Sequence, residues 1–168
     1  AGARVAINPL ISCGKCRACA SGDRHLCASR ELIGMRYPGA FAEQVMIPES
    51  NLTRLDDHLS FQDAALAEPL AVAVRTVGLA ESGGATRDSR SVILGGGAIG
   101  LLCAKVMKAG GYAPPRIAET NSLRRAMLEG LGLGDCYDPR DGGPDEGSVD
   151  LVIDAVGMGA TRAAASAM

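Results

Sequence analysis

The chain has 168 residues, of which 47% are apolar, 3% aromatic and 21% charged, and its formal net charge is −2. This length supports one large domain or two small ones, and the composition is that of an ordinary globular protein. No run of basic residues reaches five, and only five aromatic side chains are present, so we expect no nucleic-acid partner. The longest apolar runs are too short to cross a bilayer, so we expect no membrane partner either.

The first ten residues, AGARVAINPL, carry one positive charge but neither a sustained apolar region nor a cleavage pattern. They lack the features of an export signal, so we expect a cytoplasmic protein. In that reducing compartment, clustered cysteines bind metal or take part in redox chemistry more often than they form disulfides. Short apolar stretches at 4–7 and 42–47, interrupted by Gly, Pro and Asn, predict small β-strands and loops up to residue 60.

Four of the six cysteines fall within the segment CGKCRACASGDRHLC, residues 13–27, with the spacing CxxCxxCx7C. Thiolates three residues apart in a tight loop can turn toward one point, and residues 20–26 bring back a fourth to complete a tetrahedron of soft ligands. Such a site is closed to water and substrate, so the metal stabilises the loop and does not catalyse. We therefore predict a structural zinc ion, held by Cys13, Cys16, Cys19 and Cys27.

Two other kinds of site also use clustered cysteines. A bacterial ferredoxin also begins CxxCxxC, but its next cysteine follows after three residues and precedes proline, whereas Cys27 comes eight residues after Cys19 and precedes alanine. A CxxC redox pair opens a helix and does not need four cysteines. His25 lies inside the loop and could replace a ligand, although four thiolates already suffice.

From residue 61 the sequence becomes apolar and alanine-rich, which predicts buried helices over 61–80, followed by a polar loop over 81–90. We place the domain boundary near Glu68, giving domains of residues 1–67 and 68–168. A carboxylate in this apolar segment is costly to bury unless it is paired or binds metal. Alternatively, Glu68 lies in the first turn of a helix with Pro69 at its first position.

The second half alternates strand and helix patterns. Such alternation predicts a parallel, doubly wound sheet of the Rossmann type, and hence an α/β fold for this half. The predicted strands are 90–94, 116–119, 136–138 and 149–157, and the predicted helices are 98–110 and 122–132.

The segment ILGGGAIG contains GxGxxG between the first predicted strand and helix. One glycine permits the tight turn, one lets the backbone approach a pyrophosphate, and one lets the helix pack close to the strand. The N-terminus of the helix then offers free N–H groups to the phosphates. The predicted cofactor-binding residues here are Gly95, Gly97, Ala98, Ile99 and Gly100.

Glu119 ends the second predicted strand, nineteen residues after Gly100. An acid at this point hydrogen-bonds both ribose hydroxyls of NAD and repels the 2′-phosphate of NADP. Arg124 is included among the candidate cofactor-binding residues, and with Arg125 it leaves the choice between NAD and NADP open.

These motifs, in this order, resemble the zinc-dependent medium-chain alcohol dehydrogenases, especially the sorbitol and threonine dehydrogenase-like branch. The four cysteines match the structural zinc ligands of that family, and PGAFAEQVMIP resembles its glycine-rich FAEY segment. Gly95, Gly97, Gly100 and Glu119 match its cofactor fingerprint. The resemblance covers essentially the whole chain and implies the end of a GroES-like β domain with a zinc lobe, followed by a truncated Rossmann domain.

The same resemblance implies a catalytic zinc whose cysteine and His-Glu ligands precede residue 1, and further strands after the last residue. Glu68 resembles the acid of the EPL motif in the family, which lies at or beside that zinc. We therefore expect the chain to be an internal fragment, inactive by itself, of a homodimeric or homotetrameric enzyme.

The function that follows is hydride transfer between a small-molecule alcohol and NAD or NADP. One alternative is a noncatalytic zinc- and nucleotide-binding module. Another is a zinc-independent quinone-reductase-like member of the same superfamily, which the cysteine lobe and the EPL motif disfavour. The sequence leaves the substrate open among polyols, amino alcohols and simple secondary alcohols.

Overall fold

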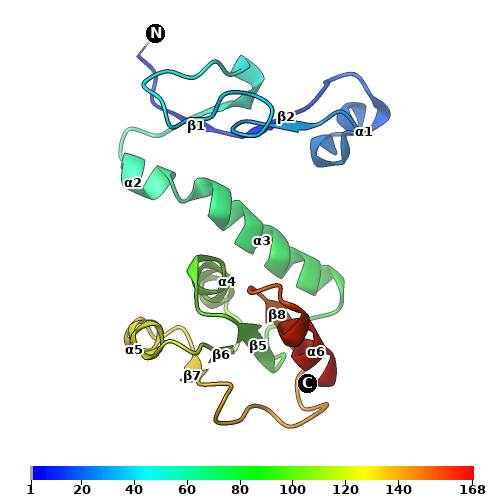
Figure 1. The fold of residues 1–168 in the computed structure, drawn as a ribbon, viewed down its shortest axis with the longest axis vertical. Coiled ribbons are helices and arrows are strands. Elements are labelled where there is room, and N and C mark those ends of the chain that lie inside the picture. Colours follow the sequence, from blue (N-terminus) through cyan, green and yellow to red (C-terminus); the bar gives the residue numbers. More distant parts are fainter. Residues whose placement is uncertain (1) are drawn as a thin grey trace. The chain divides into compact units, whose positions relative to one another are not determined.

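The computed structural model describes residues 2–168 as two compact units, of which the first ends at Ala67 and the second comprises Glu68–Met168 (Figure 1). Each unit has its own sheets and packing, and each is described by itself below. Within the described part of the chain, no helix combines the length and the hydropathy that crossing a bilayer requires.

The first unit is built on two short antiparallel strand pairs. The side-chain amide of Asn51 is buried and donates to the carbonyls of Asn8 and Leu10, both at 2.8 Å, so it ties the two pairs together. Strand β1 (Val5–Ile7) pairs with β4 (Leu52–Arg54), and β2 (Leu10–Ile11) pairs with β3 (Glu31–Leu32). The helices are α1 (Arg17–Ala20), η1 (Arg24–Leu26), η2 (Glu49–Asn51) and α2 (Phe61–Ala64).

The strand predicted over 42–47 is wrong, because this segment is irregular and Met46 in it is exposed. An apolar pattern forms a strand only where a neighbouring strand takes up its backbone hydrogen bonds. None of the strands described in residues 2–168 pairs with this segment. The strand predicted at 4–7, by contrast, is confirmed as β1, since β4 lies beside it.

The second unit is a four-stranded, wholly parallel sheet in the order β7-β6-β5-β8. This confirms the predicted alternation of strands and helices. The strands are β5 (Ser91–Leu94), β6 (Arg116–Ala118), β7 (Asp135–Tyr137) and β8 (Leu151–Asp154). The helices are α3 (Ala67–Ser82), α4 (Ala98–Ala109), α5 (Ser122–Gly130) and α6 (Gly159–Ala167).

The core of the second unit lies mainly on one face of this sheet, where Ile93 and Ile117 pack against Leu102 and Met107 of α4 and Leu128 of α5. The opposite face carries a smaller cluster around the buried side chains of Val92, Leu94 and Ala118, with Ala165 of α6 and Met168 beside them. In Figure 1, α6 lies next to β8, in agreement with its contacts. The sheet is therefore covered on both faces, as a doubly wound fold requires.

Helix α3 is not buried as predicted. Only Ala73 and Val77, one turn apart, join the core, whereas Val74 and Leu79 are exposed. An alanine-rich apolar segment predicts a helix well, but how many of its faces are covered depends on elements far away in the sequence.

The segment before β8 is tied to the start of β5 by a two-pronged ion pair. Asp150 accepts hydrogen bonds from the backbone N–H of Arg90 and from its guanidinium, at 2.8 to 3.1 Å. The side-chain and backbone hydrogen bonds from Arg90 lower the pKa of Asp150 to about 2. The pair therefore fixes the register of β8 against β5 at their amino ends.

Because the pKa of Asp150 is lower in the folded chain than its ordinary value of 3.8, its contribution to stability is present above that value and is lost as the pH falls through about 2. We expect Asp150→Asn to be less stable than the parent chain at neutral pH. The gap should close on acidification below about pH 4. Urea unfolding of both chains across this range measures it, and a gap that stays constant with pH would contradict the assignment.

Candidate zinc and dinucleotide sites

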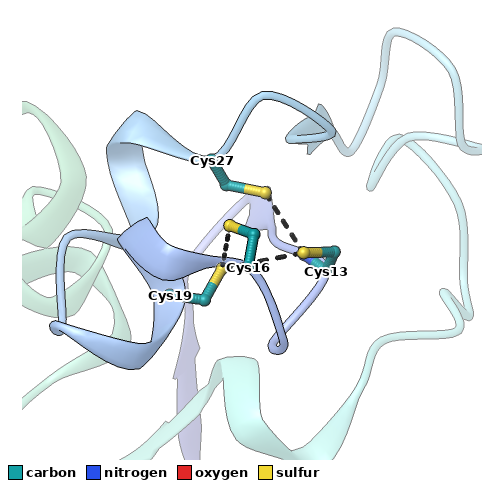
Figure 2. Close-up of side chains that lie close together, drawn as sticks. All are labelled: Cys13, Cys16, Cys19 and Cys27. Atoms are coloured by element: carbon teal, nitrogen blue, oxygen red, sulfur yellow. Dashed lines mark hydrogen bonds between the residues drawn. The ribbon is translucent and has the colours of Figure 1, made fainter.

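The four cysteines of the first unit converge on one point. Figure 2 shows their sulfur atoms turned toward one another, with Cys13 and Cys27 on the segments that flank α1 and η1. All four sulfur atoms lie within 4.8 Å of one another. The Sγ atom of Cys19 is 3.9 Å from that of Cys13 and 3.5 Å from that of Cys16. Tetrahedral zinc with Zn–S bonds of about 2.3 Å has sulfur–sulfur edges of about 3.8 Å, so the spacing fits this ion.

Local backbone geometry gives the thiols unequal acidity. Backbone N–H groups of Lys15 and Cys16 lower the pKa of the Cys13 thiol to about 6. A backbone N–H of Cys19 favours the Cys16 thiolate, but hydrogen bonding to the Cys19 sulfur and burial outweigh it and raise the pKa of Cys16 to about 11. Four adjacent thiolates repel one another, so a divalent cation is what lets all of them ionise together.

His25 lies exposed on η1, and the group of potential metal ligands found within residues 2–168 consists of the four cysteines. Glu68 belongs to no such group. It lies exposed in the first turn of α3, so the burial that motivated a metal role is not observed. Pro69 is the third residue of that helix, not the first as predicted, but it still lies in the turn whose N–H groups have no partner inside the helix.

In the second unit, the glycine motif forms the turn between β5 and α4. Gly95 has a φ of +94°, which other residues rarely adopt. A Cβ at Gly100 would lie 1.9 Å from the Gly95 carbonyl oxygen, so helix and strand approach too closely for any side chain. A Cβ at Gly97 would meet nothing within 4 Å, so the backbone there borders open space. Ala98 and Ile99 begin α4, whose first N–H groups are free for an anion.

Gly96, which the sequence reasoning missed, is the point where this turn meets Glu119. Its N–H donates to Oε2 of Glu119 at 3.0 Å. A Cβ at Gly96 would lie 2.6 Å from Leu128 and 3.2 Å from the Glu119 side chain. The run of three glycines at 95–97 indicated a special turn, but the role of each glycine depends on its contacts with residues far away in the sequence.

Glu119 is only 6% exposed, and both of its carboxylate oxygens accept backbone hydrogen bonds. Oε1 accepts from the N–H of Asn121 at 2.8 Å, and Arg124 lies 3.6 Å from Oε2. Burial disfavours the charged form, but the N–H groups of Asn121 and Gly96 and the charge of Arg124 outweigh it and hold the pKa of Glu119 below its ordinary value. An ionised, oriented carboxylate therefore stands beside the glycine turn.

The turn lies where the order of the strands reverses, since β6 and β8 flank β5 on opposite sides. The crevice outside the carboxyl ends of the strands at this point is where open α/β sheets bind ligands. Asp154, at the end of β8, accepts hydrogen bonds from the N–H groups of Val156 and Gly157, so its carboxylate is satisfied within its own turn. The turn that it shapes places Val156 against Gly95.

A separate hollow of about 480 Å³ lies at the opposite edge of the sheet. It is lined by residues that precede β5, β6 and β8, among them Arg90, Pro114 and Ser148. These are the amino ends of the strands, away from the glycine turn and Glu119. Its lining mixes both signs of charge with apolar groups and contains no element of a dinucleotide site.

Three comparisons with known proteins bear on these sites. Residues 1–57 match the alcohol dehydrogenase GroES-like domain. D-altritol 5-dehydrogenase of Agrobacterium fabrum is 33% identical over 162 residues, covering 94% of this chain and 47% of that protein. L-threonine 3-dehydrogenase of Caldanaerobacter subterraneus is 36% identical over 129 residues, covering 77% of this chain and 36% of that protein.

A crystal structure assigned as a zinc-binding dehydrogenase from Sinorhizobium meliloti 1021, bound to NADP, superposes with a TM-score of 0.83 and 31% identity. The match covers 96% of this chain and 49% of that one. A GroES-like unit with a four-cysteine lobe and a Rossmann sheet with a glycine turn together define a zinc-containing dinucleotide-binding protein. The chain belongs to the zinc-dependent medium-chain alcohol dehydrogenase family. It spans at most about half the length of these relatives.

Proposed function

We propose that this chain is the zinc-lobe and cofactor-binding part of an oxidoreductase that transfers hydride between a small-molecule alcohol and NAD. The observation that carries the proposal is the pairing of an open glycine turn with the buried, ionised Glu119, 3.0 Å from the N–H of Gly96. The glycine turn and the first N–H groups of α4 would hold the pyrophosphate. Glu119 would accept hydrogen bonds from the adenosine ribose.

When bound, the nicotinamide supplies or accepts the hydride. The residues of this chain bind and orient the cofactor for that step. Glu68 is exposed and stands apart from other metal ligands, so no step is assigned to a catalytic zinc. The four cysteines would hold a structural zinc ion that stabilises their loop.

The test is a binding titration of the zinc-loaded chain with NADH and with NADPH, followed by the change in cofactor fluorescence. We expect NADH to bind more tightly, because Glu119 accepts from ribose hydroxyls and repels a 2′-phosphate. Glu119→Gln keeps the shape but removes the charge, and should reduce the preference for NADH about tenfold, the value of one charged hydrogen bond. Absence of NADH binding by the parent chain would overturn the proposal.

The alcohol dehydrogenases named above act on polyols and on a hydroxy amino acid, according to their names. We propose a small polyol or amino alcohol as substrate, a homodimer or homotetramer as the functional assembly, and the cytoplasm as the compartment. The cluster of free thiols suits a reducing environment. Light scattering coupled to size-exclusion chromatography would determine the assembly.

A further inference from the structure

Asp138, which follows β7, is a buried acid at the centre of an ion cluster that the glycine fingerprint does not include. Its side chain is 7% exposed. Arg140 forms a two-pronged pair with it, donating from Nε at 2.9 Å and from Nη2 at 2.6 Å, and the backbone N–H of Arg140 adds a third bond. Arg125 of α5 donates to the same carboxylate from Nη1 at 3.1 Å. These hydrogen bonds hold the pKa of Asp138 far below its ordinary value.

Both arginines also reach the turn that follows β6. Arg125 donates to the carbonyl oxygen of Glu119 at 2.6 Å, and Arg140 donates to that of Thr120 at 3.1 Å. Asp138 thus orients two guanidinium groups that donate hydrogen bonds to successive carbonyl groups of one turn, residues 119–121. Bidentate arginine–carboxylate pairs fix geometry as well as adding energy.

This turn, which the two arginines hold by hydrogen bonds, also orients the carboxylate of Glu119. Its third residue, Asn121, donates its N–H to Oε1 of Glu119 and also caps α5 through its side chain. A shift of the turn would move this N–H away from the carboxylate. Buried ion pairs often add little net stability, because desolvation offsets their attraction. The main effect of this cluster is therefore to hold the turn in place through the hydrogen bonds of the two arginines.

We propose that Asp138 is a positioning residue that, through Arg125 and Arg140, holds the Glu119 carboxylate in the orientation that distinguishes NADH from NADPH. This inference rests on the proposed function, in which Glu119 binds the adenosine ribose. It assigns cofactor specificity to a residue nineteen positions beyond the acid in the sequence. It also gives the exposed Arg140 a role that does not require contact with the cofactor.

The test measures dissociation constants for NADH and NADPH with the zinc-loaded chain and its Asp138→Asn variant. We expect the NADH affinity to fall about tenfold and the NADPH affinity to change less than about twofold, so that the preference falls about tenfold. Simple loss of folded protein would weaken the binding of both cofactors equally and leave the ratio of their dissociation constants unchanged. A preference unchanged in Asp138→Asn would overturn the proposal.

Asp150→Asn is the matched control, because Asp150 forms the same two-pronged pair with Arg90 at the opposite ends of the strands. It should leave the cofactor preference unchanged, and an equal loss of preference there would count against a specific role for Asp138. If Asp138→Asn does not fold, Arg140→Ala is the alternative variant, because the Arg140 side chain is 70% exposed and its removal disturbs the fold less. Arg140→Ala should likewise lower the preference for NADH over NADPH. No loss of preference in that variant would overturn the proposal.

A double variant separates this inference from the proposed function. In a Glu119→Gln background, Asp138→Asn should lower the preference no further, because its effect passes through the Glu119 carboxylate. If Glu119→Gln lowers the preference but Asp138→Asn does not, the positioning role fails and the proposed function stands. If the parent chain binds neither cofactor, both fail.

Discussion

Replacing Cys19 with serine is expected to release the metal and unfold residues 12–30. Cys19 is buried, and its sulfur lies 3.9 Å from that of Cys13 and 3.5 Å from that of Cys16. Structural zinc contributes about 10–16 kcal/mol of apparent binding free energy to small zinc-dependent folds. The helices of the lobe are the four-residue α1 and the single turn η1, which are too short to hold the loop together without the metal. Zinc content measured by elemental analysis should fall from about one ion per chain to near zero.

Trypsin cleavage measures unfolding of the lobe separately from metal loss, because the lobe has exposed lysine and arginine residues. Lys15, Arg17, Arg24 and Arg30 all lie on the surface of the lobe. We expect rapid cleavage at these residues in the variant, or in the parent chain after chelation, while the second unit stays protected. Cys136→Ser is the control, since Cys136 lies on β7 in the second unit and should keep both the zinc and the resistance of the lobe.

The same elemental analysis tests the identity of the metal. Zinc without visible absorption agrees with the tetrahedral spacing of the sulfur atoms. Iron with a brown chromophore would contradict the zinc assignment and indicate an electron-transfer protein. A Cys19→Ser variant that keeps a full complement of zinc would show that the four thiols are not the ligands.

The glycine turn and the parallel sheet were predictable because their signals are local. The run SVIL before three glycines and the helical segment after them specify β5, the turn and α4 within about twenty residues. The convergence of four cysteines was predictable for the same reason, since their spacing within one loop brings them together. Asn121 could also have been predicted, because Asn before a helical pattern is a common N-cap.

Features that depend on distant partners were not predictable from the pattern. The sequence makes Asp138 the last residue of the predicted strand 136–138, and its ion pairs form only because the sheet places β7 beside β6 and brings Arg125 within reach. Residues 42–47 have a strand-like pattern but lack a neighbouring strand in the described structure. The apolar neighbours of Glu68 favoured burial as one of two alternatives, yet those neighbours are themselves largely exposed and Glu68 lies in the first turn of α3, which was the other alternative. Burial follows from what covers a segment, which its own sequence does not state.

Alanine at Gly100 should destabilise the fold, whereas alanine at Gly97 should weaken cofactor binding and leave the fold intact. At Gly100 the new methyl would lie 1.9 Å from the Gly95 carbonyl oxygen, which is backbone and has no rotamer to change. We expect Gly100→Ala to lose about 3 kcal/mol or more of unfolding free energy, because α4 must move away from β5. Cofactor binding would be lost with the fold, so urea unfolding is the informative measurement.

At Gly97 the methyl would meet nothing within 4 Å, and the backbone there has a φ of −73°, which alanine tolerates. We expect the unfolding free energy of Gly97→Ala to stay within about 0.5 kcal/mol of the parent chain. Its NADH affinity should nevertheless fall at least about tenfold, because the methyl occupies the space through which the pyrophosphate approaches the backbone. NADH titration and urea unfolding of the same samples test both parts.

Gly78→Ala supplies the matched control for the two variants, since Gly78 lies inside α3 with nothing within 4 Å of its Cβ position. Alanine there should stabilise the chain by about 0.5–1 kcal/mol and leave NADH binding unchanged. If Gly97→Ala instead binds NADH as tightly as the parent chain, the open space beside Gly97 is not where the pyrophosphate lies. The glycine spacing would then serve only to pack α4 against β5, and the case for a dinucleotide would rest on Glu119 alone.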